Sequence, residues 1–170
     1  MTGHVRIVND PIEIVPLIVT FNNKKFKEIY ELLNKNWLTE EELLTHADPA
    51  IVADCLTILK KGNLIEEQWR MPKPGDKPAK EFRTTYSKFR ANFQCSMSDL
   101  SDLLHIAVST NEHLRLLVDQ IEQEIIGGNS SINDMARKLN CNTTVIKGLA
   151  KRIPQFDVKG QTLILLERNE

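Results

Sequence analysis

The sequence predicts a mainly helical chain with small β-ribbons, an α+β fold class. Apolar residues recur at helical spacing in segments that open with a Ser, Thr, Asp or Asn cap. Twice, a group of helices is followed by two strand-like runs around a turn, at residues 64–86 and 155–166. Helix, turn, helix and ribbon is the layout of a winged helix. We therefore expect tandem winged helix-turn-helix domains joined by a long helix.

The first copy of this layout covers about residues 22–86. Thr39 and Glu42 have the spacing of a capping box at the start of a short helix. Asp48-Pro49 opens the next helix with an N-cap and a proline at the first helical position, and Gly62-Asn63 ends it. A strand, a turn with three prolines and a second strand follow, at residues 64–71, 72–78 and 80–86.

Two earlier segments complete the N-terminal part. Residues 1–9 are short and we expect them to fray. Asp10-Pro11 caps a first helix that is apolar on too many sides to be solvated, so we expect a second copy of the chain to cover it. Asn22 or Asn23 begins the next helix, which is amphipathic.

The C-terminal part repeats the pattern. Amphipathic helices begin at Ser98 and after Thr110, and glycines at 127 and 128 end the second. Ser131 and Asp134 form another predicted capping box, and Asn142 caps a second candidate recognition helix before a hairpin. We predict a winged helix-turn-helix domain with its leading helix at 10–95, a connecting helix at 96–110 and a second winged-helix-like domain at 111–170.

Charge is distributed unevenly although the formal net charge of the 170 residues is only −1. Residues 70–90 contain seven basic and two acidic side chains. Residues 96–126 contain one basic and six acidic side chains, and residues 127–160 contain six basic and two acidic ones. Two basic lobes on either side of an acidic connector are therefore expected, without a global attraction to nucleic acid or membrane. The lack of a signal-peptide pattern and of an apolar run of about 20 residues predicts a cytoplasmic protein with no membrane partner.

Catalytic and metal-binding motifs do not stand out. The sequence has no glycine-rich phosphate loop, G-x-S-x-G or H-E-x-x-H, so we expect neither an enzyme nor a cofactor. Three distant cysteines argue against a disulfide framework and a zinc ribbon. Asp102 and His105 share a helical face, and one interpretation is a metal site completed by His113 of a partner chain. Surface histidines are the favoured interpretation, so no metal is predicted.

Nucleic-acid binding has a concrete mechanism in this layout, because a recognition helix enters the major groove while basic wing residues neutralise phosphates. The candidate DNA-binding residues are Lys60, Lys61, Arg70, Lys73, Lys77, Lys80, Arg83, Lys147, Lys151 and Arg152. Each group has a second interpretation. The wing cations can be a solvated hairpin edge, the lysine pair at 60–61 can stabilise a helix end, and the last three can be merely solvated.

Residues 26–90 resemble the ArsR-type winged-helix regulators of bacteria and archaea. Residues 51–56 (IVADCL) lie over that family's T-V-S-x-H-L helix, and residues 59–66 (LKKGNLIE) over its L-x-x-A-G-L-V turn into the wing. The resemblance implies a homodimer, built from the first helix and the helix after the wing, that acts as a repressor or activator. Ala53 and Asp54 depart from the Ser and the long polar or basic side chain that the family commonly presents to DNA.

The sequence thus favours a DNA-binding transcriptional regulator that acts as a homodimer on double-stranded DNA. The alternative is a tandem winged-helix scaffold for a protein partner, without direct DNA binding. The aspartate at position 54, the near-neutral net charge and the apolar first helix favour that alternative.

Overall fold

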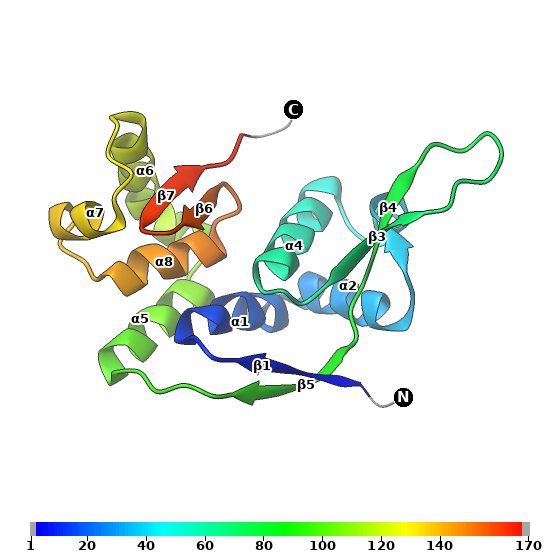
Figure 1. The fold of residues 1–170 in the computed structure, drawn as a ribbon, viewed down its shortest axis with the longest axis horizontal. Coiled ribbons are helices and arrows are strands. Elements are labelled where there is room, and N and C mark those ends of the chain that lie inside the picture. The colour runs from blue at the N-terminus through cyan, green and yellow to red at the C-terminus, as the bar shows by residue number, and fades with distance from the viewer. Residues whose placement is uncertain (1–2, 168–170) are drawn as a thin grey trace.

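The computed structural model describes residues 3–167, which form mostly helices with three small β-sheets (Figure 1). The N-terminal half contains β1 (His4–Val8), a 3-10 turn (Pro11–Glu13), α1 (Ile14–Asn22), α2 (Lys24–Lys35), β2 (Leu38–Thr39), α3 (Glu40–Leu43), α4 (Pro49–Lys61), β3 (Glu66–Arg70), β4 (Ala79–Arg83) and β5 (Tyr86–Ala91). The C-terminal half contains α5 (Met97–Val108), α6 (Asn111–Ile126), α7 (Ile132–Lys138), α8 (Thr143–Arg152), β6 (Phe156–Lys159) and β7 (Thr162–Leu165). The predicted α+β class with a helical majority is confirmed.

Helix α1 lies at the centre of the molecule, between α2 and α4 on one side and α5 and α8 on the other (Figure 1). Val15 and Val19 are buried there, in a core that the two halves share. A helix that is apolar on most of its surface must be covered. The expectation that a second copy covers it is wrong, because α5 and α8 of the same chain do so.

The first helix-turn-helix forms as its caps predict. The side chain of Asn23 accepts hydrogen bonds from two backbone N–H groups of α2, and Thr39 and Glu42 make both arms of a capping box. Asp48 is the N-cap of α4 but makes no side-chain cap bond. Asn63 takes the left-handed conformation after α4, with φ of 49°. The sheet order β2-β4-β3 completes the arrangement of a winged helix.

The C-terminal elements follow the same order. Helices α6, α7 and α8 precede the β6–β7 hairpin, and an isolated bridge between Ser131 and Thr162 occupies the place of β2. Ser131 accepts from the N–H of Asp134, but the reciprocal arm of the predicted capping box is not formed. Helix α8 faces inward. A Cβ on Gly148 would lie 3.0 Å from a methyl carbon of Leu103, so the glycine allows α8 to approach α5 closely.

Strands β1 and β5 form a parallel pair that the sequence pattern did not predict. The register pairs Val5 with Lys88 and Ile7 with Arg90, across more than 80 residues of sequence. The expectation that residues 1–9 fray is therefore wrong for residues 4–8, and residues 1 and 2 lie outside the described part. Strand β5 follows directly from the wing strand β4 and carries the chain under α1 towards α5 (Figure 1).

Candidate nucleic-acid interface

The wing consists of β3, β4 and the loop of residues 71–78 between them. This loop projects away from the rest of the molecule (Figure 1), and all eight of its residues are exposed. Three prolines stiffen the loop, and Gly75, with φ of 94°, allows the reversal of the chain. Lys73 and Lys77 lie in this loop, and within residues 3–167 neither side chain has an ion-pair partner. The wing therefore presents two unneutralised cations at its tip.

Arg70 fastens the base of the wing to the helix-turn-helix. Its Nη1 atom donates to Glu42 at 2.7 Å and its Nε atom donates to Glu81 at 2.6 Å. Its Nη2 atom also donates to the carbonyl oxygen of Trp37. The bonds from Arg70 and the capping bond from Thr39 lower the pKa of Glu42 to about 2. The candidate cation at position 70 is thus committed within the chain.

Lys60 and Lys80 share one carboxylate on the face of the wing. Their Nζ atoms lie 3.1 Å and 3.0 Å from the two oxygens of Glu67. Lys60 also lies over the ring of Phe82 and Lys80 over the ring of Trp69. All three charged side chains are exposed, and exposed pairs of this kind contribute about 0–1 kcal/mol. These cations can consequently leave Glu67 for a stronger anionic partner.

The last wing candidate, Arg83, is half-buried at the end of β4. Its Nε atom is buried and has no hydrogen-bond partner among the residues that the structure describes. The side chain of Arg83 is therefore less exposed to solvent than those of Lys73 and Lys77 at the wing tip.

The exposed side of α4 is short of positive charge. Ala50, Ala53 and Asp54 are exposed in its first half, and its basic residues stand at its C-terminal end. Helix α3 adds exposed carboxylates at Glu40 and Glu41. The helix-turn-helix surface is therefore neutral to acidic, in contrast to the wing tip.

Lys61 and Lys151 connect α4 to α8. The Nζ atom of Lys61 donates to the carbonyl oxygens of Ala150 and Phe156, and that of Lys151 donates to the carbonyl oxygen of Lys61 at 3.0 Å. Burial lowers the pKa of Lys61 to about 8, opposed by the nearby charge of Asp157. Both candidate cations lie between the two halves of the chain.

Arg152 is also committed internally. It donates to the carbonyl oxygen of Ser109 at 2.9 Å and to the side chain of Asn111 at 3.1 Å, where α5 ends and α6 begins. Burial lowers its pKa. Lys147, in contrast, is half-buried and has no ion pair within residues 3–167. Among the three candidates on α8, Lys147 retains an uncommitted cation.

The structure reveals two further cations that belong to the basic segment but are not among the sequence-predicted candidates. Lys88 and Arg90 are exposed on β5. Their alternation with Phe89 is a signal for a strand with one basic face. The partner strand β1 cannot be inferred from that signal.

The described residues contain neither a cluster of metal ligands nor a membrane-spanning helix. Asp102 lies 3.5 Å from the side-chain amide of Asn142, and no group of three His, Cys, Asp or Glu side chains in residues 3–167 could hold a metal ion. None of the helices described has the length and apolar character required to cross a bilayer.

A comparison with protein families extends the resemblance beyond residues 26–90. The model of the family described as ArsR transcriptional regulator matches residues 8–167, which include both halves of the chain. No curated protein matches the sequence. The matched range covers nearly all of the 170 residues, and the chain belongs to the ArsR family of transcriptional regulators.

Proposed function

We propose that this protein is a cytoplasmic DNA-binding transcriptional regulator whose first winged helix contacts duplex DNA chiefly through its wing. Membership of the ArsR family supports regulation of transcription. The observation that carries the DNA contact is the projecting loop of residues 71–78, where Lys73 and Lys77 have no ion pair within the described chain. Phosphate contacts of this kind supply affinity through the release of counterions.

The wing can bind phosphates without losing its shape. Arg70 holds the base of the wing to α3 through Glu42, so it acts as a positioning residue in this proposal. Lys60 and Lys80 would exchange the exposed carboxylate of Glu67 for a DNA phosphate, at small cost because the pair is solvated. Arg83 adds a cation at the other end of β4.

Helix α4 would supply the sequence reading. Its exposed residues Ala50 and Ala53 are small, which allows close approach to a thymine methyl group. Asp54 can accept a hydrogen bond from the N4 group of cytosine but repels phosphates. In this proposal α4 selects bases and the wing supplies most of the affinity.

We infer that residues 111–170 form a second winged-helix domain that supports the first one. The order of α6, α7, α8 and the β6–β7 hairpin favours this assignment, as does the bridge between Ser131 and Thr162. Residues 96–110 would be the connecting helix. Since Lys61, Lys151 and Arg152 bond to carbonyl groups of the chain, we assign them to the contact between the halves. Lys147 remains the candidate DNA contact of α8.

The homodimer stays a prediction, and the interface that the family resemblance implies for it must be replaced by another surface. The resemblance implies an interface made by the first helix and the helix after the wing, which correspond to α1 and α5. In this chain these helices pack on each other and on α8. A dimer would therefore use another surface, and analytical ultracentrifugation at several concentrations will measure whether one forms.

Titration of duplex DNA at several salt concentrations tests the proposal. We expect neutralisation of the wing in the variant K73Q/K77Q/K80Q to weaken binding at least tenfold. The slope of log affinity against log salt should fall by about 0.9 for each phosphate that the variant no longer neutralises. The matched control K24Q/K25Q/K27Q removes three exposed lysines of α2 and should bind almost as the parent protein does.

Equal weakening in the two triple variants would contradict a specific role for the wing. The protein-scaffold alternative retains one observation, the neutral to acidic exposed surface of α3 and α4. The absence of DNA affinity at low salt, together with a stoichiometric protein partner, would select that alternative.

A further inference from the structure

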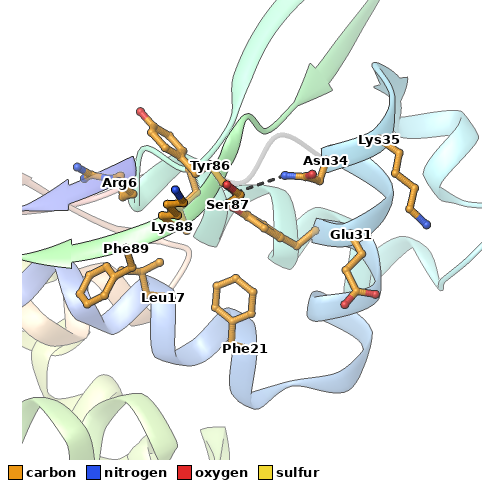
Figure 2. Close-up of a pocket in the computed structure, with 12 residues that line it drawn as sticks. Arg6, Leu17, Phe21, Glu31, Asn34, Lys35, Tyr86, Ser87, Lys88 and Phe89 are labelled. Atoms are coloured by element: carbon orange, nitrogen blue, oxygen red, sulfur yellow. Dashed lines mark hydrogen bonds between the residues drawn. The ribbon is translucent and has the colours of Figure 1, made fainter. Parts of the chain in front are cut away.

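A pocket of about 420 Å³ lies between β5 and the helices α1 and α2 (Figure 2). Its walls include four aromatic and two aliphatic side chains, Phe21, Tyr30, Tyr86, Phe89, Leu17 and Leu64. Its volume falls within the range of small-molecule sites, which are mostly apolar with a few polar groups. The DNA-binding proposal makes no use of this pocket.

Two of the aromatic rings are left unusually open. Phe21 is 47% exposed and Phe89 is 53% exposed, although both lie against helical core elements. Phe21 meets the ring of Tyr30 edge to face, with centroids 5.0 Å apart, and Figure 2 shows Phe89 beside Leu17. Covering these rings would remove apolar surface from water, which stabilises a bound apolar group.

Positive charge borders the apolar walls. Arg6, Lys35 and Lys88 all line the pocket, and Figure 2 shows Lys88 on the side of β5 opposite Phe89. Arg6 is held by the carbonyl oxygen of Gly62 and by Glu13, whereas Lys88 and Lys35 have no ion pair in the part of the chain described. The single carboxylate of the lining, Glu31, lies 3.7 Å from Lys27 outside the pocket. The lining is therefore net positive.

We propose that this pocket binds a small organic carboxylate with an aromatic or branched apolar body. The apolar body would cover the rings of Phe21 and Phe89. The carboxylate would reach past the edge of β5 that is left unpaired in residues 3–167 to Lys88, which projects from the face of the strand opposite Phe89. Arg6 would add positive potential from its fixed position. A neutral analogue of the same shape lacks this charge pairing and binds more weakly.

The pocket is connected to the wing through the backbone of β5. The carbonyl oxygen of Tyr86 accepts hydrogen bonds from the hydroxyl of Tyr30 at 2.7 Å and from the amide of Asn34 at 3.3 Å. Only Thr84 and Thr85 separate this anchor from β4. A ligand held between α1, α2 and β5 would favour one position of β5 and thereby of the wing. This regulatory consequence rests on the proposed DNA binding, whereas the binding site itself does not.

Calorimetric titration of the full chain with 1-naphthylacetate tests the site directly, with neutral 1-naphthylacetamide as the chemical control. We expect saturable one-site binding of the acid, at least tenfold weaker binding of the amide and at least fivefold weaker binding of the acid by Lys88→Met. The matched variant Lys24→Met, which removes an exposed lysine outside the pocket, should keep the parent affinity. A second variant, Phe89→Ser, removes an exposed ring of the wall and should weaken both compounds, with circular dichroism checking its fold.

Several results would overturn the site: no binding of the acid, equal binding of acid and amide, or parent affinity in both pocket variants. The protein is first titrated with 1-naphthylacetate to saturation and is then titrated with duplex DNA. Together these two measurements separate the two proposals. Acid binding by a protein without DNA affinity supports the site and contradicts the DNA proposal. DNA binding without acid binding supports the DNA proposal and contradicts the site.

Discussion

Lys61 and Lys151 each reach across to the other's helix and donate a hydrogen bond to its backbone. Lys61 donates to the carbonyl oxygen of Ala150 at 2.7 Å, and Lys151 donates to the carbonyl oxygen of Lys61 at 3.0 Å. These carbonyls lie at the C-terminal ends of α4 and α8, where a positive charge is favourable. The two corresponding helices of the repeated pattern are thus held end to end within one chain.

The Lys61 contact predicts an alkaline rise in stability. Burial lowers the pKa of Lys61 to about 8. At a pH where Lys61 is charged in both the folded and the unfolded protein, burial of this charge therefore reduces the free energy of unfolding. Between about pH 8 and the ordinary lysine pKa the unfolded chain binds more protons, and the free energy of unfolding rises with pH. We expect a gain of roughly 2 kcal/mol from this group, using about 1.4 kcal/mol per pKa unit and allowing for partial exposure.

Urea denaturation of the parent protein and of Lys61→Met at pH 7 to 10 measures this difference. The parent should gain stability relative to the variant as pH rises. The matched variant Lys60→Met, at the exposed neighbouring position, should follow the parent curve. Parallel curves for parent and Lys61→Met would contradict the prediction.

Removal of Arg70 should loosen the wing. In Arg70→Met, Glu42 and Glu81 lose a shared cation, and we expect the free energy of unfolding at pH 7 to fall by about 1 kcal/mol, given the partial exposure of the pair. Because the pKa of Glu42 is lowered, its contribution is present above the ordinary glutamate pKa. It is lost as pH falls through about 2.

The difference between parent and Arg70→Met should therefore shrink in acid, and NMR titration should show the pKa of Glu42 rising in the variant. Arg115→Met provides the control, because Arg115 is 80% exposed and lies 3.9 Å from Asp119. A similar loss of stability in both variants would show that the base of the wing has no special role.

Enlargement of Gly148 should separate α8 from α5. A Cβ there would lie 3.0 Å from Leu103 and 3.1 Å from Ile106, and the branches of valine would extend further into that contact. We expect Gly148→Val to reduce the free energy of unfolding by about 2 kcal/mol. Ala53→Val, which adds a β-branched side chain on the exposed face of α4, should cost less than about 1 kcal/mol in the same urea titration.

The three cysteines should differ in reactivity. Cys55 is completely buried and burial raises the pKa of its thiol to about 12, while Cys95 and Cys141 are half-buried. We expect Cys95 to react first with a disulfide reagent at pH 8. Cys141 should be slower because burial raises its pKa, and Cys55 should react only on unfolding. Rapid modification of all three thiols in native protein would contradict this order.

The features that the sequence determined by itself are those encoded within a few neighbouring residues. The cap at Thr39 needs only Glu42 three residues later, and the end of α4 needs a residue such as Asn63 that tolerates positive φ. The burial of Cys55 also has a local basis, because it recurs with the other apolar residues of α4 at helical spacing. The choice of Lys73 and Lys77 as wing candidates has the same local basis, and their role in DNA binding remains a prediction.

The features that only the tertiary structure decided depend on segments far apart in the chain. Pairing of β1 with β5 joins the two ends of the N-terminal half. Helices α5 and α8 cover α1 because the two halves bury apolar surface against each other. A lysine or arginine on a helix has the same sequence neighbours whether it faces water or another element, so the sequence pattern could not separate Lys61 and Arg152 from the exposed Lys60. The carbonyl groups that these two side chains bond to are 40 to 100 residues away, and only the fold brings them within reach.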